Sequence, residues 1–261
     1  MGLLKNLADS YRENKVSFRV WVILQVLVVA TMVRHIVSGD MHSAFVCLLT
    51  LALFLAPALV KRTFKVMIPT MLEVLVLCFI FSAEILGEIN NYYMRIPSWD
   101  TILHTLNGFA AAGVGLSLMI MVDAGSQRIK MTAGFTALMA FCFSMTVGVV
   151  WEFGEYFADS FLGKDAQRDT FISEIYTVSL DETRTNTVIY IGDIQHTVLY
   201  GSDGEVVGEF DGYLDVGLHD TMKDLLVNAI GAGVFCVFGY FYVKYGKLKF
   251  LNNWLIRKKT D

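Results

Sequence analysis

The sequence predicts an all-α polytopic membrane protein with about six transmembrane helices and a small extracytoplasmic β-hairpin or meander between the fifth and sixth. Three observations predict this fold class. Of the 261 residues, 55% are hydrophobic and the mean hydropathy is +0.52, which is too apolar for a soluble domain of this length. The apolar residues form blocks long enough to cross about 30 Å of hydrocarbon as helices. Basic clusters occupy alternate connections between these blocks.

The apolar blocks set the predicted spans, and a leader precedes them. Residues 1–17 are mixed polar and form either an interfacial helix, with an apolar stripe, or a plain polar segment. The leader lacks a short apolar core followed by a small-residue cleavage site, so the first span is predicted to be a retained anchor. We place the spans near residues 18–38, 41–60, 64–87, 99–122, 131–158 and 219–244.

The connections between the spans predict the topology. Clusters of Lys and Arg precede the first span, separate the second from the third and the fourth from the fifth, and follow the sixth. By the positive-inside rule, both termini are cytoplasmic and residues 245–261 form a basic cytoplasmic tail. The protein is therefore expected in the lipid bilayer of a cytoplasmic membrane, with no nucleic acid partner.

An acidic segment interrupts the membrane domain. The membrane domain covers residues 18–163 and resumes with the sixth span at 218–244. Residues 164–217 are the extracytoplasmic insertion, and segment 159–218 holds twelve acidic residues against three basic ones, a local net charge of −9. Short β-branched or aromatic runs separated by turn residues predict strands at 187–191, 197–200 and 205–210. The four cysteines all lie in predicted spans, so no disulfide framework is expected.

Pairs of ionisable residues occur at helix ends inside apolar segments. In each pair the residues are three or four positions apart, so they share one helix face. The predicted topology places every pair within about two turns of the outer boundary, and charges at membrane depth are expensive and usually functional. Asn107 and Asn228 extend two of these faces inward. The pairs are Asp100 and His104, Glu152 and Glu155, Asp220 and Asp224, and Glu84 and Glu88.

The predicted cluster has two chemical interpretations. With a metal, oxygen-rich ligands and one imidazole suit Mg²⁺, Mn²⁺ or Ca²⁺, whereas fewer carboxylates with His104 suit Zn²⁺. The metal ligands would be Asp100, His104, Glu152, Glu155, Asp220 and Asp224. Without a metal, like charges raise the pKa values of some carboxyls. Asp100, His104, Glu152 and Glu155 would then act as catalytic acids and bases or relay protons.

Structural roles compete with these interpretations. Asp100 and Asp220 lie near helix N-termini, where a carboxylate caps backbone amides and complements the helix dipole. Glu73 could pair with a polar group of a neighbouring helix. Arg95, just before the fourth span, could clamp a phosphate or carboxylate over the cluster or form an ordinary surface ion pair. Capping does not explain Glu152 and Glu155, because acidic groups at a helix C-terminus oppose its dipole.

The segment GEINNYYMRIPSWDTILHTLNGF at 87–109 resembles the YjdF-like family of bacterial inner-membrane proteins. Its Tyr-x-Arg-x-Pro, Asp-x-x-x-His and Gly-Phe patterns match, as do Glu-x-x-Glu at 152–155 and the segment HDTMKDLLVNAIGA at 219–232. The insertion departs from the family pattern. The pattern is more distantly similar to VanZ-like proteins. The resemblance covers roughly residues 64–244 and implies a bacterial inner-membrane location and an envelope role, without supplying a reaction.

Three functions are compatible with these features. The first is an outer-leaflet site that binds a divalent cation and acts on a lipid-linked or cell-envelope substrate. The second is a proton- or cation-coupled transporter or binding protein, with Glu84 and Glu73 extending a path inward. The third is a non-enzymatic envelope assembly factor whose insertion recruits a protein partner. The first requires the cluster to be closed from the inside, whereas the second requires polar residues that continue to the inner face.

Overall fold

A computed structural model describes residues 14–125 and 130–259 of the chain. Among these residues, six helical segments are long and apolar enough to cross a membrane, which confirms the predicted fold class. The predicted apolar stripe of the leader, at residues 3–11, lies outside the described residues. The six segments are Lys15–Ser38, Met41–Phe64, Thr70–Ile89, Trp99–Gly125, Ala133–Leu162 and Leu218–Tyr245.

The chain divides into two compact units. The bundle unit comprises the described residues up to 149 together with those from 224 onward, and the insertion unit comprises residues 150–223. The boundaries fall inside α8 (Ala133–Leu162) and α9 (Leu218–Tyr245), so each of these helices contributes to both units.

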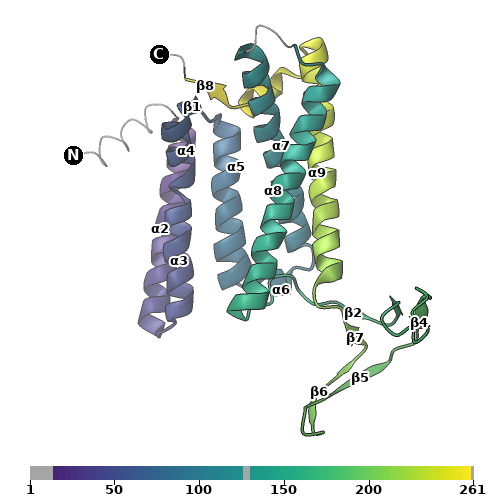
Figure 1. Cartoon of the computed structure of the whole chain (residues 1–261). Coiled ribbons are helices and arrows are strands. Elements are labelled where there is room, and N and C mark those ends of the chain that lie inside the picture. The colour runs from purple at the N-terminus through teal and green to yellow at the C-terminus, as the bar shows by residue number, and fades with distance from the viewer. Residues whose placement is uncertain (1–13, 126–129, 260–261) are drawn as a thin grey trace. The chain divides into compact units, whose positions relative to one another are not determined.

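The bundle unit begins with a helical hairpin. In α2 (Lys15–Ser38) the N-cap Asn14 accepts a hydrogen bond from the Ser17 amide, and Gly39 ends the helix in the left-handed conformation that glycine adopts easily. Asp40 then caps α3 (Met41–Leu53), and α4 (Ala56–Phe64) completes the second span. Figure 1 shows α2 and α3 side by side. Their shared core with the third span contains Leu24, Val28, Cys47, Phe54, Leu77 and Ile85.

The third span differs from its predicted start at residue 64. Phe64 ends α4, Lys65 takes a left-handed backbone conformation, and strand β1 (Val66–Met67) follows. The span begins with α5 (Thr70–Phe81), directly after Pro69, which lacks the amide hydrogen needed inside a helix. It ends as the π-helix η1 (Ser82–Ile89), which carries Glu84 and Glu88.

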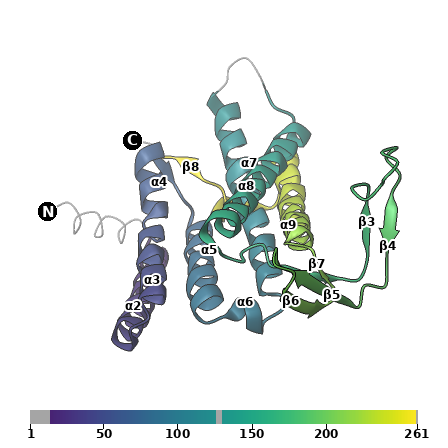
Figure 2. The ribbon, with the colours of Figure 1, turned by 60° about the horizontal axis from the view of Figure 1, so that its bottom comes forward.

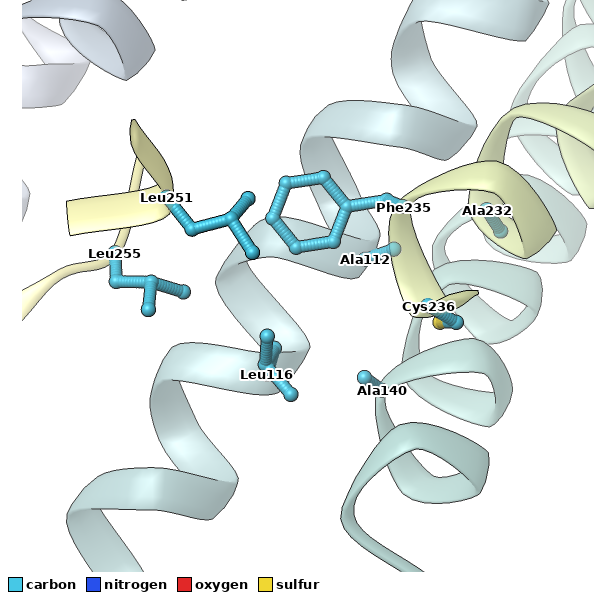
Figure 3. Close-up of a cluster of buried hydrophobic side chains, with 8 residues drawn as sticks. All are labelled: Ala112, Leu116, Ala140, Ala232, Phe235, Cys236, Leu251 and Leu255. Atoms are coloured by element: carbon cyan, nitrogen blue, oxygen red, sulfur yellow. The ribbon is translucent and has the colours of Figure 1, made fainter. Parts of the chain in front are cut away.

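The fourth span and the chain end build the second core of the bundle unit. After the short helix α6 (Tyr92–Arg95), α7 (Trp99–Gly125) packs against the bundle-unit parts of α8 and α9. Figure 3 shows Leu251 and Leu255 pointing toward this core, where Leu116 and Phe235 are fully buried. Leu251 itself is 0% exposed, so the tail after α9 is part of the core and not a free basic extension.

The tail is held by backbone as well as side-chain contacts. Helix η2 (Lys249–Asn253) and strand β8 (Arg257–Lys258) follow α9, and the Trp254 ring meets the Phe109 ring edge-on at 5.3 Å. Strand β8 pairs antiparallel with β1, so the chain end reaches across to α4 (Figure 2). Since Phe109 lies near the middle of α7, the tail returns deep into the bundle.

The insertion unit contains three separate two-stranded sheets. Strand β2 (Phe171–Ile172) pairs with β7 (Tyr213–Leu214), β3 (Ile175–Thr177) pairs with β4 (Ile189–Ile191), and β5 (His196–Tyr200) pairs with β6 (Val206–Asp211). The β5–β6 hairpin agrees with the predicted strands at 197–200 and 205–210. Among the described residues no three-stranded sheet forms, so the meander alternative is wrong.

One carboxylate secures the base of the insertion. Asp215 accepts hydrogen bonds from the amides of Thr170 at 2.7 Å, Gly217 at 3.2 Å and His219 at 2.7 Å. Its side chain is only 3% exposed, and the His219 ring lies 2.6 Å away. These contacts join the start of the insertion to its end and to the first turn of α9.

Candidate functional site

Two glycines bring α7 and α9 into backbone contact. A Cβ atom on Gly108 would collide with the backbone carbonyl of Asn228, and one on Gly231 would collide with the backbone carbonyl of Thr105. Small residues allow this close approach of helices in membrane proteins, where packing replaces the hydrophobic effect as the driving force. Because α7 and α9 are this close, polar side chains one or two turns away on the facing surfaces must also meet.

A buried amide network lies between these helices. Asn107 donates from Nδ2 to Oδ1 of Asn228 at 3.2 Å, and Asn228 donates to the backbone carbonyl of Ser144 on α8 at 3.4 Å. The Ser144 hydroxyl donates to the carbonyl of Gly108 at 2.8 Å. Asn228 is 1% exposed, and buried polar groups require such partners. The sequence predicted Asn107 and Asn228 as secondary site residues, and the structure joins them directly.

Asp100, His104 and Asp224 lie together one turn from this network. His104 Nε2 is 3.6 Å from Asp100 Oδ1 and also 3.6 Å from Asp224 Oδ2. The side chains are 8% exposed for His104, 15% for Asp100 and 1% for Asp224. Asp100 and His104 are four residues apart on α7, and Asp224 is four residues before Asn228 on α9. We call these three residues the Asp–His–Asp group.

The Asp–His–Asp group has the dimensions of a metal site. One ligand atom from each residue lies within 4.8 Å of the others. Tetrahedral Zn²⁺ with ligands at about 2.0–2.1 Å holds neighbouring ligand atoms about 3.4 Å apart, close to the 3.6 Å separations around His104 Nε2. Two carboxylates also supply the negative charge that offsets a divalent cation. The donor set fits Zn²⁺ or Mn²⁺ with room for further ligands.

Trp99 borders the Asp–His–Asp group in sequence. Its ring meets the Tyr92 ring edge-on at 5.0 Å, and its indole N–H is buried without a hydrogen-bond partner among the described residues. A buried indole N–H normally finds an acceptor, and the described residues do not supply one for Trp99. Trp99 was not among the predicted site residues, although its position directly before Asp100 was a usable signal.

Other predicted site residues of the bundle unit lie elsewhere. Glu84 is half-buried and Glu88 exposed on the π-helix η1, a rare element that often marks functional sites. Neither is a member of the Asp–His–Asp group. Arg95 is exposed on α6, so its clamping role stays a prediction. Glu73 pairs with Lys61 of α4 at 2.6 Å, in agreement with the structural role expected for it.

The insertion unit holds the remaining predicted ligands. Glu152 is buried on α8, and Trp151 donates from its indole nitrogen to Glu155 at 2.8 Å. Asp220, in the first turn of α9, accepts a 3.4 Å hydrogen bond from Lys223. Whether these three acids join the Asp–His–Asp group stays a prediction.

Comparison with known proteins places the chain in a family. The family model described as predicted membrane protein (DUF2238) matches residues 19–245, which include the Asp–His–Asp group and nearly all of the six spans. The resemblance to YjdF-like proteins is consistent with this match. No curated protein and no solved structure matches the chain.

Proposed function

We propose that this chain, which belongs to the family described as predicted membrane protein (DUF2238), binds a divalent cation at the Asp–His–Asp group and acts there on a lipid-linked or cell-envelope substrate. The observation that carries the proposal is the position of His104 Nε2, 3.6 Å from a carboxylate oxygen on each side. A buried carboxylate, Asp224, and a half-buried one, Asp100, around one imidazole are costly in a membrane protein unless a cation or a proton compensates them.

The chemistry of the site follows from this ligand set. Three protein ligands leave at least one coordination position for water or substrate, as in catalytic zinc sites. A cation held there would polarise a phosphoryl or carbonyl oxygen and acidify a bound water. The Asn107–Asn228 pair fixes α7 and α9 directly beneath the ligands, so it acts as a positioning element. Trp99 offers its indole N–H to a bound molecule.

Helix periodicity predicts three further acidic residues for this site. Glu152 and Glu155 follow Gly148 on one face of α8, at four and seven residues, and Asp220 precedes Asp224 by four residues on α9. We propose Glu152 and Glu155 as acid–base groups and Asp220 as an additional ligand. Each of these assignments rests on spacing in the sequence.

The bundle unit supports access to the site from one side. Inward from Asn107 and Asn228, the core contains the apolar side chains of Ala112, Leu116, Ala232, Phe235, Leu251 and Leu255. A coupled transporter needs a polar path to the inner face, and this layer interrupts one along α7 and α9. The basic clusters lie at the opposite ends of the spans, which supports an outer-leaflet site in a bacterial cytoplasmic membrane, with both termini inside.

Elemental analysis of the protein purified in mild detergent tests the proposal. The protein is first supplied with Zn²⁺, Mn²⁺ or Mg²⁺ and then freed of excess metal. We expect about one equivalent bound to the wild type and a loss of at least tenfold in Asp224→Asn. Asp211→Asn is the matched control, because that side chain is 99% exposed on β6.

Two results would contradict the proposal. The first is a wild-type protein that retains no metal under any of these conditions. The second is an Asp224→Asn variant that keeps its metal while remaining folded. If the protein binds metal but does not hydrolyse lipid phosphates, the cation site is supported and the hydrolytic role is rejected. A binding or assembly function is then favoured.

A further inference from the structure

An apolar groove runs between α8 and α9 in the bundle unit, near the end of α9 that carries Lys244. Its lining side chains are apolar except for the hydroxyl of Tyr240. Leu138 and Val237 on its walls are 54% and 55% exposed. The walls of the groove include Gly134, Leu138 and Phe141 of α8 and Gly233, Val237 and Tyr240 of α9.

Two glycines leave unfilled space in this groove. A Cβ atom built on Gly134 or Gly233 would meet no other atom within 4 Å. In contrast, a Cβ on Gly239 of the same helix would press against Leu116, because Gly239 faces the protein core. The groove is therefore an outward-facing hollow and not a helix contact of this chain.

The ammonium group of Lys244 lies at the end of the groove, next to Tyr240. Lys244 donates from Nζ to the Tyr240 hydroxyl at 2.7 Å and lies 5.0 Å from the centre of the Tyr245 ring. Lys247 lies 5.9 Å from the same ring. Among the described residues, neither lysine forms a salt bridge with a carboxylate. Exposed lysine charge with no acidic partner, one turn beyond an apolar groove, is complementary to an anion that carries a hydrocarbon chain.

We propose that this groove binds an anionic phospholipid of the leaflet at the basic end of the bundle. One acyl chain fills the hollow over Gly134 and Gly233, and the phosphate is held by Lys244 and the Tyr240 hydroxyl. Basic pockets between transmembrane helices on the cytoplasmic side bind such headgroups, and lysines at helix ends reach the headgroup level while their stems stay apolar. None of the groove residues belongs to the Asp–His–Asp group.

A second copy of the chain fits this groove less well. Two copies in one membrane have the same orientation, so a symmetric dimer across α8 and α9 would bring equivalent faces together. Lys244 and Lys247 would then approach the same lysines of the partner, and like charges brought together oppose association. A phospholipid supplies the opposite charge at that position instead.

Lipid binding to the full chain in detergent tests the proposal. The probes are phosphatidylglycerol and phosphatidylcholine with identical acyl chains, and bound lipid is counted by native mass spectrometry. For the wild type we expect at least fivefold tighter binding of phosphatidylglycerol. Gly233→Leu should lower binding of both lipids at least fivefold, because the new side chain enters the hollow from a Cβ position that meets no other atom within 4 Å. Lys244→Gln should keep acyl binding and lose the preference for phosphatidylglycerol.

A matched control separates the groove from general surface effects. Gly154 of α8, like Gly233 of α9, has open space around its Cβ position, but it does not line the groove. Gly154→Leu should bind both lipids as the wild type does. Equal binding of the two lipids by the wild type, or unchanged binding by Gly233→Leu, overturns the proposal. A dimer mass that disappears in Gly233→Leu also overturns it, in favour of a second copy as the occupant.

Discussion

The backbone N–H of Ile256 donates a 2.9 Å hydrogen bond to the hydroxyl of Ser117, which itself donates to the Gly113 carbonyl at 2.6 Å. Residues 139 positions apart are thereby joined in the interior of the bundle unit. Ser117 is 1% exposed, so water does not replace this contact. The hydroxyl ties the returning chain end to the centre of α7 and closes the core beneath the candidate site.

Replacement of Ser117 by Ala should loosen the chain end. The variant leaves the buried Ile256 amide without its acceptor, which costs about 1–3 kcal/mol of unfolding free energy. Unfolding in mixed micelles, followed by tryptophan fluorescence, measures the loss. Thr146→Ala is the control, since Thr146 is exposed and its hydroxyl donates to the Cys142 carbonyl of its own helix, its one bond within the described ranges. Equal stability of Ser117→Ala and the control would show that the tail is not held in this way.

The contact between α7 and α9 should be intolerant of one added methyl group. Gly108→Ala places a Cβ against the Asn228 carbonyl. The helices must then separate, at a cost of about 1–3 kcal/mol from overpacking. Because the Asp–His–Asp group spans the same two helices, bound metal should fall with stability. Gly125→Ala, where the new Cβ meets nothing within 4 Å, should retain both. Wild-type metal content in Gly108→Ala would contradict this coupling.

Replacement of one member of the Lys61–Glu73 pair should lower the free energy of unfolding more than replacement of both. The side chains are 17% and 8% exposed, and Glu73 Oε2 is buried without a hydrogen-bond partner among the described residues. Removal of one member of a buried ion pair costs about 3–5 kcal/mol, whereas apolar replacement of both is often neutral. We therefore expect Lys61→Met to destabilise strongly and Lys61→Met with Glu73→Leu to recover most of the loss. A double-mutant cycle on unfolding free energies measures this, and additive effects would exclude the coupling.

The base of the insertion should open in acid. Burial opposes the charged form of Asp215, but hydrogen bonds from Thr170, His219 and Gly217 prevail and hold the pKa of its carboxyl below the ordinary 3.8. A depressed pKa means that the carboxylate stabilises the folded insertion above pH 3.8. This stabilisation is lost as the pH falls below 3.8 and passes through the pKa of Asp215 in the folded state.

Hydrogen exchange of the Thr170 and His219 amides tests the acid opening. Protection, corrected for the intrinsic exchange rate, should be high at pH 5 and decline below pH 3.8. Asp215→Asn should show weak protection at both pH values, while Asp211→Asn should follow the wild type. If Asp215→Asn is protected as strongly as the wild type at pH 5, the carboxylate does not hold the base.

The predicted spans agree with the structure because they depend on local composition. An apolar block of about twenty residues becomes a spanning helix whatever its neighbours are, since unpaired backbone groups are not tolerated in hydrocarbon. The same applies to the β5–β6 hairpin, where Ser202-Asp203-Gly204 supplies the turn between alternating strands. The third span shows the limit of this reasoning, because apolar Phe64 belongs to α4 and not to the helix after Pro69.

The candidate site was predictable as a set of residues and not as an arrangement. Helix periodicity placed Asp100 with His104, and Asp224 with Asn228, because these relationships lie within one helix. Their meeting depends on the glycine contacts at Gly108 and Gly231, which bring α7 and α9 together. A sequence pattern indicates that such glycines permit close packing of helices. It does not indicate which other helix packs against them.

The sequence by itself determined which segments cross the membrane, which end of each span is basic, and which polar residues share a helix face. Only the tertiary structure decided that Asp100 and His104 face Asp224, and that the chain end returns to the bundle. The tail at 245–261 is short and basic, so no local pattern distinguishes it from a solvated extension. Leu251 and Leu255 are buried because α7, α8 and α9 leave a space of their shape, and that space exists only when all three helices are assembled.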